Sequence, residues 1–143
     1  MARPQKVGLD YFPHDTDASN DMKMQALLSL CGLAGVGFYW YLIERMYKED
    51  DFMLDVSDAE TIQILCRNMA VTTQEYDRYL AVCLKYGLFC QKTFTENHKL
   101  CSDGVMKRAK VVIEKRRESQ KRYEEAKAKI ISRAEKRQKL TQK

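Results

Sequence analysis

Apolar residues recur at helical spacing through most of the first hundred residues. This pattern predicts helices over about residues 20–31, 35–49, 58–69 and 73–86. Gly32 and Gly87 stand where the first and the last of these helices would end. The second helix is the most apolar segment and is predicted to form the centre of the core, with Val36, Tyr39, Trp40, Ile43, Met46 and Tyr47 on its buried side.

Two capping boxes are predicted at the starts of the third and fourth helices. Ser57 and Glu60 have the required spacing, and so do Thr72 and Glu75. In each box the hydroxyl of the first residue accepts a hydrogen bond from the amide three residues later, and the carboxylate of that later residue accepts one from the amide of the first. Each cap stabilises its helix by about 1 kcal/mol. Two caps so close together predict a short helix–turn–helix.

Short strand-like segments surround this pair of helices. They are residues 51–56, 88–91 and 99–101, with a polar loop over 92–98 between the last two. The resulting order, helix–strand–helix–helix–strand–strand, predicts a mainly α fold, a winged helix-turn-helix with an extra N-terminal helix and a small β-hairpin wing. We expect this domain over residues 20–102, after an irregular segment over 1–19.

Charge divides the chain at about Ser102. Residues up to that point hold ten Lys and Arg against fourteen Asp and Glu, whereas residues 103–143 hold fifteen against six. The front part is therefore at −4 and the rest at +9, which sum to the net +5 of the chain. The basic part has no proline and pairs such as Glu118 with Arg122, which predict one long helix over 103–143 with a frayed distal end.

Composition argues against a catalytic or metal-binding protein. The five cysteines form no C-x-x-C pair, and four of them lie among apolar neighbours, as expected for small hydrophobic residues in a reducing compartment. His14 and His98 are far apart, and the acidic run from Asp15 to Asp21 lacks the glycine and the glutamate of a calcium loop. No glycine-rich phosphate loop is present. We expect a cytoplasmic, non-enzymatic protein without cofactor, metal or membrane partner.

Four stretches resemble a known family. The opening Gly8-Leu9-Asp10-Tyr11-Phe12-Pro13-His14-Asp15-x-Asp17 is similar to the start of an N-terminal domain found in phage and mobile-element proteins. That domain is related to the winged-helix N-terminal domain of DnaD-type replisome-organiser proteins. The further stretches begin at Gly37, Cys83 and Ser102, so the resemblance covers about residues 8–117. It implies a role in replication initiation or in another process on DNA, with self-association or replication proteins as partners.

Two regions are candidates for contact with nucleic acid. In a DNA-binding winged helix the helix over 73–86 would enter the groove, with Gln74 and Arg78 reading bases and with Lys92 and Lys99 on the wing. Glu75 and Asp77 would face phosphates with the wrong sign. The basic helix is the stronger candidate because eight cations fall within sixteen residues: Lys107, Arg108, Lys110, Lys115, Arg116, Arg117, Lys121 and Arg122.

Two alternatives to this interpretation are open. The chain could be a protein-interaction or oligomerisation module without direct DNA contact, or a winged-helix transcriptional regulator. Self-association could use the aromatic helix around Trp40. A coiled coil of the last helix is less favoured, because Arg116, Ser119, Arg133 and Arg137 interrupt its apolar seam of Ala109, Val112, Tyr123, Ala126, Ile130 and Leu140.

Overall fold

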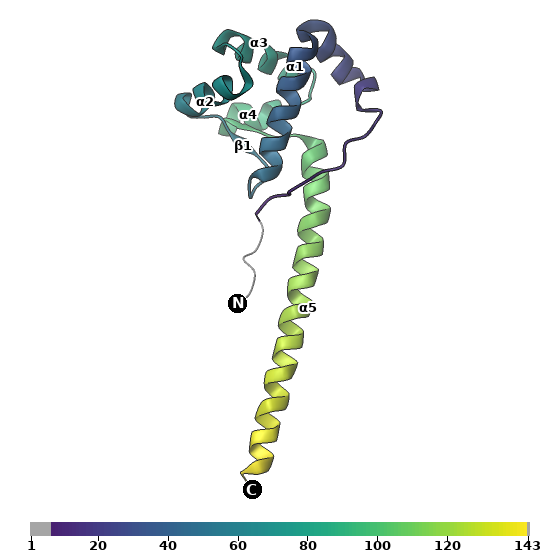
Figure 1. Ribbon diagram of the computed structural model, residues 1–143, viewed down its shortest axis with the longest axis vertical. Coiled ribbons are helices and arrows are strands. Elements are labelled where there is room, and N and C mark those ends of the chain that lie inside the picture. The colour runs from purple at the N-terminus through teal and green to yellow at the C-terminus, as the bar shows by residue number, and fades with distance from the viewer. Residues whose placement is uncertain (1–6, 143) are drawn as a thin grey trace. The chain divides into compact units, whose positions relative to one another are not determined.

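The computed structural model describes residues 7–142 and is mainly helical (Figure 1). Its elements are η1 (Ala18–Asn20), α1 (Met22–Lys48), β1 (Leu54–Asp55), α2 (Ala59–Met69), α3 (Thr73–Lys85), α4 (Gln91–Asn97), β2 (Lys99–Leu100) and α5 (Asp103–Thr141). The chain forms two compact units, Met1–Lys107 and Arg108–Lys143. Helix α5 begins in the first unit and continues through the second.

Helix α1 contains the two first predicted helices, joined at a kink. Gly32 has φ 69° and ψ −169°, a left-handed conformation that favours glycine and breaks the helical path at the predicted stop. Asp21 caps the start of α1, where its side chain accepts the amide of Lys23 at 2.8 Å. The acidic run before α1 therefore acts in turn and cap formation, as Asp15 Oδ1 also accepts the amide of Asp17 at 2.9 Å.

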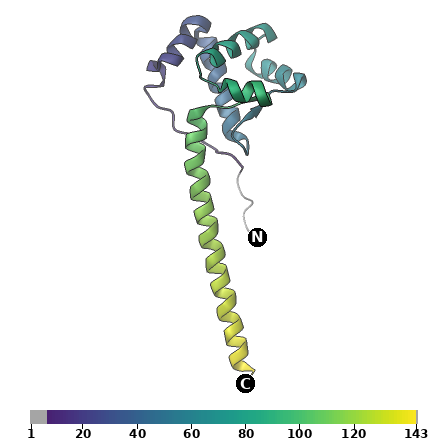
Figure 2. The ribbon, with the colours of Figure 1, turned by 180° about the vertical axis from the view of Figure 1, so that it is seen from behind.

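The core of the first unit forms where α1 packs on α3. Leu42 and Cys83 are fully buried, and Phe38 of α1 meets the rings of Tyr76 and Tyr79 edge-on at 5.5 Å. Helix α2 packs on α3 to complete a helix–turn–helix, which the views from both sides show (Figure 2). Of the six positions predicted on the buried side of the second helix, Ile43, Met46 and Tyr47 are buried. Val36, Tyr39 and Trp40 are half-buried, and the buried Phe38 and Leu42 were missed.

One of the two predicted capping boxes forms. At α3, Glu75 donates its amide to Thr72 Oγ1 at 3.0 Å, and Thr72 donates its own to the Glu75 carboxylate at 3.3 Å. The box predicted at Ser57 is wrong, because Ser57 donates both its amide and its hydroxyl to Asp55. Asp58 is the N-cap of α2 instead and accepts the amide of Glu60 at 3.4 Å.

The predicted β-hairpin wing is also wrong. Helix α4 takes the place of most of the polar loop expected over 92–98, and residues 88–91 form no strand. Strand β2 pairs antiparallel with β1, in the register Leu54 with Leu100 and Asp55 with Lys99. The Cys90 amide donates to the Cys101 carbonyl at 2.8 Å. This hydrogen bond is the part of the pairing expected between residues 88–91 and 99–101 that forms. The fold is thus a helical domain with a small two-stranded sheet.

Cysteine serves as an apolar residue throughout. All five are free, and four are buried: Cys31, Cys66, Cys83 and Cys101. Burial disfavours the thiolate and raises the pKa of Cys83 to about 12. Among residues 7–142, no group of three or more His, Cys, Asp or Glu side chains could hold a metal ion.

Helix α1 is the one described helix that is long and apolar enough to cross a membrane by length and composition. Core helices of water-soluble domains pass the same test. Leu27, Leu42 and Met46 of α1 are fully buried within the first unit. Its apolarity is therefore accounted for in part by the core that it forms with α3.

Candidate nucleic-acid interface

The eight predicted cations of the basic helix lie on the first half of α5. Seven of them are exposed and Arg116 is half-buried. Arg108 and Arg116 both take part in interactions within the protein. The remaining six therefore present their charges to solvent: Lys107, Lys110, Lys115, Arg117, Lys121 and Arg122.

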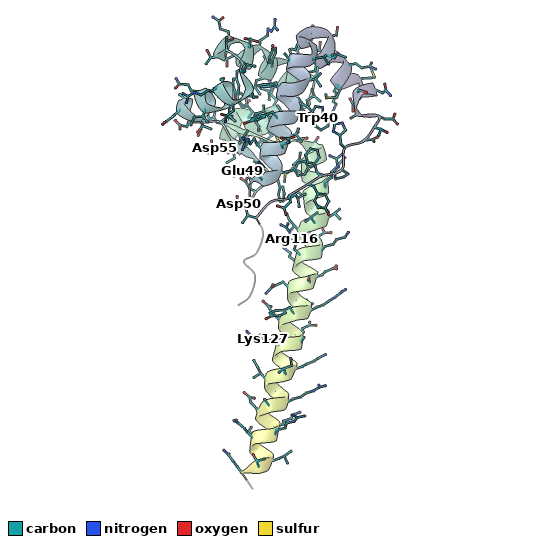
Figure 3. All side chains as sticks on the ribbon, in the orientation of Figure 1. Trp40, Glu49, Asp50, Asp55, Arg116 and Lys127 are labelled. Atoms are coloured by element: carbon teal, nitrogen blue, oxygen red, sulfur yellow. The ribbon has the colours of Figure 1, made fainter. Side chains whose placement is uncertain are left out.

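The rest of α5 continues this exposed surface. Every described side chain from Arg117 to Gln142 is exposed, including the cations Lys127, Lys129, Arg133 and Arg137 (Figure 3, where Lys127 is labelled). Local interactions support the helix, since Gln120 Nε2 donates to Glu124 Oε1 at 3.0 Å. A helix that buries so little in its own chain is free to present its charges to a partner.

The candidate base-reading residues lie on the surface of α3. Gln74 and Arg78 are both exposed, but the Arg78 guanidinium lies over the ring of Tyr79, 5.2 Å from its centroid. Glu75 is held in the capping box, where hydrogen bonds with Thr72 lower the pKa of its carboxyl. A fixed negative charge therefore stands beside the two candidate readers.

The two predicted wing lysines do not form a pair on one hairpin. Lys92 is exposed on α4. Lys99 lies on β2, and its ammonium forms an ion pair with Asp51 at 2.8 Å. Because Lys99 already contacts a carboxylate, it is a weaker candidate for a phosphate than the exposed lysines of α5.

Sequence reasoning missed the contact between the N-terminal segment and α1. Leu9 donates its amide to the Tyr47 carbonyl at 2.7 Å, and the Phe12 ring stacks on Tyr47 at 4.4 Å. His14 packs on Trp40 at 4.1 Å. The aromatic residues in this stretch, which was predicted to be irregular, were the signal that it packs against the domain. The ring of Trp40, a candidate for self-association, is thus partly covered by residues of its own chain.

Apolar residues are exposed on the first half of α1 instead. Leu28, Leu30 and Leu33 are 42%, 54% and 79% exposed. They lie on both sides of the kink at Gly32. Leu28 and Leu30, two helical positions apart, lie on nearly opposite sides of α1, and the more exposed Leu30 and Leu33 are a second candidate for contact with another protein.

Comparisons with known proteins place the chain in a family. The model of the family Lin1244/Lin1753-like, N-terminal, matches residues 11–105. The uncharacterized phage-related protein Lin1244/Lin1753 of Listeria innocua serovar 6a is 36% identical over 118 residues, which are 82% of this chain and 38% of the relative. The chain thus spans well under half of that relative. No solved structure matches. The expected similarity to an N-terminal domain of phage-related proteins is confirmed, and the chain belongs to the Lin1244/Lin1753-like, N-terminal family.

Proposed function

We propose that this chain is a non-enzymatic protein that binds nucleic acid, in the first place DNA, through the cations of α5. The observation that carries this proposal is the segregation of charge, −4 before residue 103 and +9 after it, together with the exposure of the basic side chains. Lys and Arg release counterions when they neutralise phosphates, and this term supplies nearly all of non-specific binding. The first unit supplies a folded anchor.

The proposed setting is replication or a related process of a phage or mobile element in the cytoplasm. The phage-related relative supports this setting, as does the resemblance of the opening motif to domains related to DnaD-type replisome organisers. The helix–turn–helix of α2 and α3 is compatible with a distant winged-helix relationship, with α4 in the place of the wing. Replication proteins are the proposed protein partners.

A matched truncation tests the proposal. A chain ending at Lys110 keeps the buried Val105 and Ala109 but loses twelve of the fifteen cations of the basic region. Titration of a labelled oligonucleotide at two salt concentrations should show salt-sensitive binding by the intact chain and little by the short one. Circular dichroism checks that the short chain folds. Equal binding by both chains would refute a role for α5.

A second candidate function is that of a protein-interaction or oligomerisation module. The exposed Leu30 and Leu33 of α1 favour it, because large apolar side chains exposed on a helix are candidates for contact with another protein. Sedimentation of the intact chain and of a Leu30→Gln, Leu33→Gln variant separates the two functions. Loss of self-association with unchanged nucleic-acid binding would show that the activities are independent. A regulator that reads bases through α3 would instead lose sequence selectivity on Arg78→Ala.

A further inference from the structure

The carboxylates of the second unit all lie on one half of α5. They are Glu114, Glu118, Glu124, Glu125 and Glu135. At about 3.6 residues per turn, each residue advances by roughly 100° around the helix, so these five side chains fall within about 120° of one another. We call the half of α5 that contains them the glutamate half.

The opposite half of α5 carries exposed cations and no carboxylate between residues 108 and 142. We call it the cationic half; beyond Arg108, its exposed cations are Lys115, Arg122, Lys127, Arg133 and Arg137. Positive charge also occurs on the glutamate half, where it is mixed with negative charge, at Lys110, Arg117, Lys121, Lys129, Lys136 and Lys139. The two halves therefore differ in net charge although they belong to one helix.

An apolar strip runs along the middle of the cationic half. Tyr123 and Ile130 are 59% and 67% exposed, and Ala126 and Ala134 lie between and beyond them at helical spacing. The strip is flanked by Arg122 and Arg133 on one side and by Lys127 on the other. Apolar and aromatic surface bordered by cations on both sides is the arrangement that proteins use to hold unpaired bases beside a tracked phosphate backbone.

We infer that the cationic half of α5 is the binding face and that its ligand is single-stranded nucleic acid. This inference rests on the proposed function and specifies the face and the form of the polyanion. A duplex offers phosphates to the cations but keeps its base faces stacked, so the strip of Tyr123 and Ile130 would gain nothing from it. Exposed bases can stack on the Tyr123 ring, and such a contact contributes about 1–3 kcal/mol per base.

The same charges argue against a second copy of the chain as the occupant. Two copies paired through this half would bring Arg122, Lys127 and Arg133 against their equivalents, with no carboxylate on the face to offset the repulsion. Glu118 stands four residues before Arg122. An exposed pair at this spacing is worth about 0.3–0.5 kcal/mol, so it does not keep Arg122 from a phosphate.

The test compares two triple variants of the full chain with the same change in charge. One replaces Lys115, Lys127 and Arg133 on the cationic half by Gln. Its matched control replaces Arg117, Lys121 and Lys139 on the glutamate half by Gln. Both remove two lysines and one arginine, and both keep good helix formers, so circular dichroism should find equal helix content.

Binding is measured by fluorescence anisotropy with a labelled oligothymidylate longer than the ~16 nucleotides covered by one single-strand-binding domain. Loss of three phosphate contacts should lower the magnitude of the log–log salt slope by about 2 and weaken binding about 100-fold at 0.1 M salt. The matched control should bind within a fewfold of the unaltered chain. Equal losses in the two variants would overturn the assignment of the face and leave the proposed function standing.

Variants of Tyr123 test the single-stranded ligand. Tyr123→Leu should weaken binding to oligothymidylate by about 5- to 150-fold, the equivalent of one lost stacking contact, while Tyr123→Phe retains it. Neither variant should alter binding to a duplex of the same length. Equal effects on both ligands, tighter binding to the duplex, or sedimentation showing that Tyr123→Leu dissolves a dimer would overturn the inference. Failure of the intact chain to bind either nucleic acid would instead refute the proposed function.

Discussion

The first unit and the distal part of α5 use apolar residues in opposite ways. In the first unit Leu27, Leu42 and Leu100 are fully buried, whereas in α5 Tyr123, Ile130 and Leu140 are at least 59% exposed. Both regions are helical, but tertiary packing stabilises one and local interactions support the other. The difference teaches that helical structure and burial are separate properties, and that surface left uncovered on a charged helix points to a partner outside the chain.

The largest expected difference between the regions is in the cost of truncating an aliphatic side chain. Leu42→Ala should lower the free energy of unfolding by about 2–5 kcal/mol, because it leaves a cavity against α3. Ile130→Ala, at an exposed position, should change it by less than about 0.5 kcal/mol. Urea unfolding followed by circular dichroism measures both. Similar losses would mean that the distal part of α5 is packed and that the contrast is false.

A pair of glycine substitutions sharpens the description of the first unit. Gly8 has φ +71°, and an added Cβ would meet the Tyr47 carbonyl oxygen. Gly8→Ala should therefore lower the free energy of unfolding by about 1–3 kcal/mol. The expected result is release of the N-terminal segment, seen as a change in Trp40 fluorescence because His14 and Phe12 would leave its ring.

Gly37 supplies the control for this substitution. It lies within α1, and a Cβ there would meet nothing within 4 Å. Gly37→Ala should therefore raise the free energy of unfolding by up to about 1 kcal/mol. If both alanine variants behave alike, the docking of the N-terminal segment does not depend on the conformation of Gly8.

The core contains one polar atom that burial should penalise. The Tyr76 hydroxyl is buried without a hydrogen-bond partner among the described residues, and burial raises its pKa. Tyr76→Phe removes the desolvated hydroxyl and keeps the contact with Phe38, so it should raise the free energy of unfolding by about 1 kcal/mol. Thermal unfolding measures the change. A loss of stability would show that the hydroxyl is satisfied in solution.

The smallest expected effect concerns acid stability. Partial burial raises the pKa of Asp51, but hydrogen bonds from Lys99 and from the Met53 amide outweigh it, so the net pKa is lowered. A lowered pKa means that the stabilisation is present above the unfolded value near 3.9 and is lost as the pH falls below it.

Because the ion pair of Asp51 with Lys99 is exposed, Asp51→Asn should lower the free energy of unfolding by only about 0.2–1 kcal/mol at pH 7. It should also make the decline of this free energy below about pH 4 less steep. Asp50→Asn removes the same charge from the neighbouring residue and is the control. An unchanged acid profile in Asp51→Asn would contradict a contribution from the pair with Lys99.

Patterns within one helix predicted the fold better than patterns that join distant segments. Apolar spacing and the glycines predicted α1, α2 and α3, an interruption at Gly32, and the capping box at Thr72. The strands were harder to place, because β2 pairs with β1 from forty-five residues earlier and two-residue strands carry little pattern. Helix α4 was missed because Phe94 alone supplies no apolar period.

The candidate interface was partly predictable for the same reason. The charge of α5 is a property of the local sequence, so its cations follow from the order of residues alone. The ion pair of Lys99 with Asp51 does not follow from local sequence, since it joins β2 to the turn before β1. The stacking of Phe12 and His14 on α1 likewise depends on how the N-terminal segment returns to Tyr47.

Amide hydrogen exchange with and without a single-stranded oligonucleotide tests most directly which region contacts the ligand. The account predicts slower exchange over residues 113–137 of α5 on addition of the oligonucleotide, with unchanged rates over the buried parts of α1 and α3. Slower exchange over residues 73–85 of α3, with α5 unaffected, would contradict it.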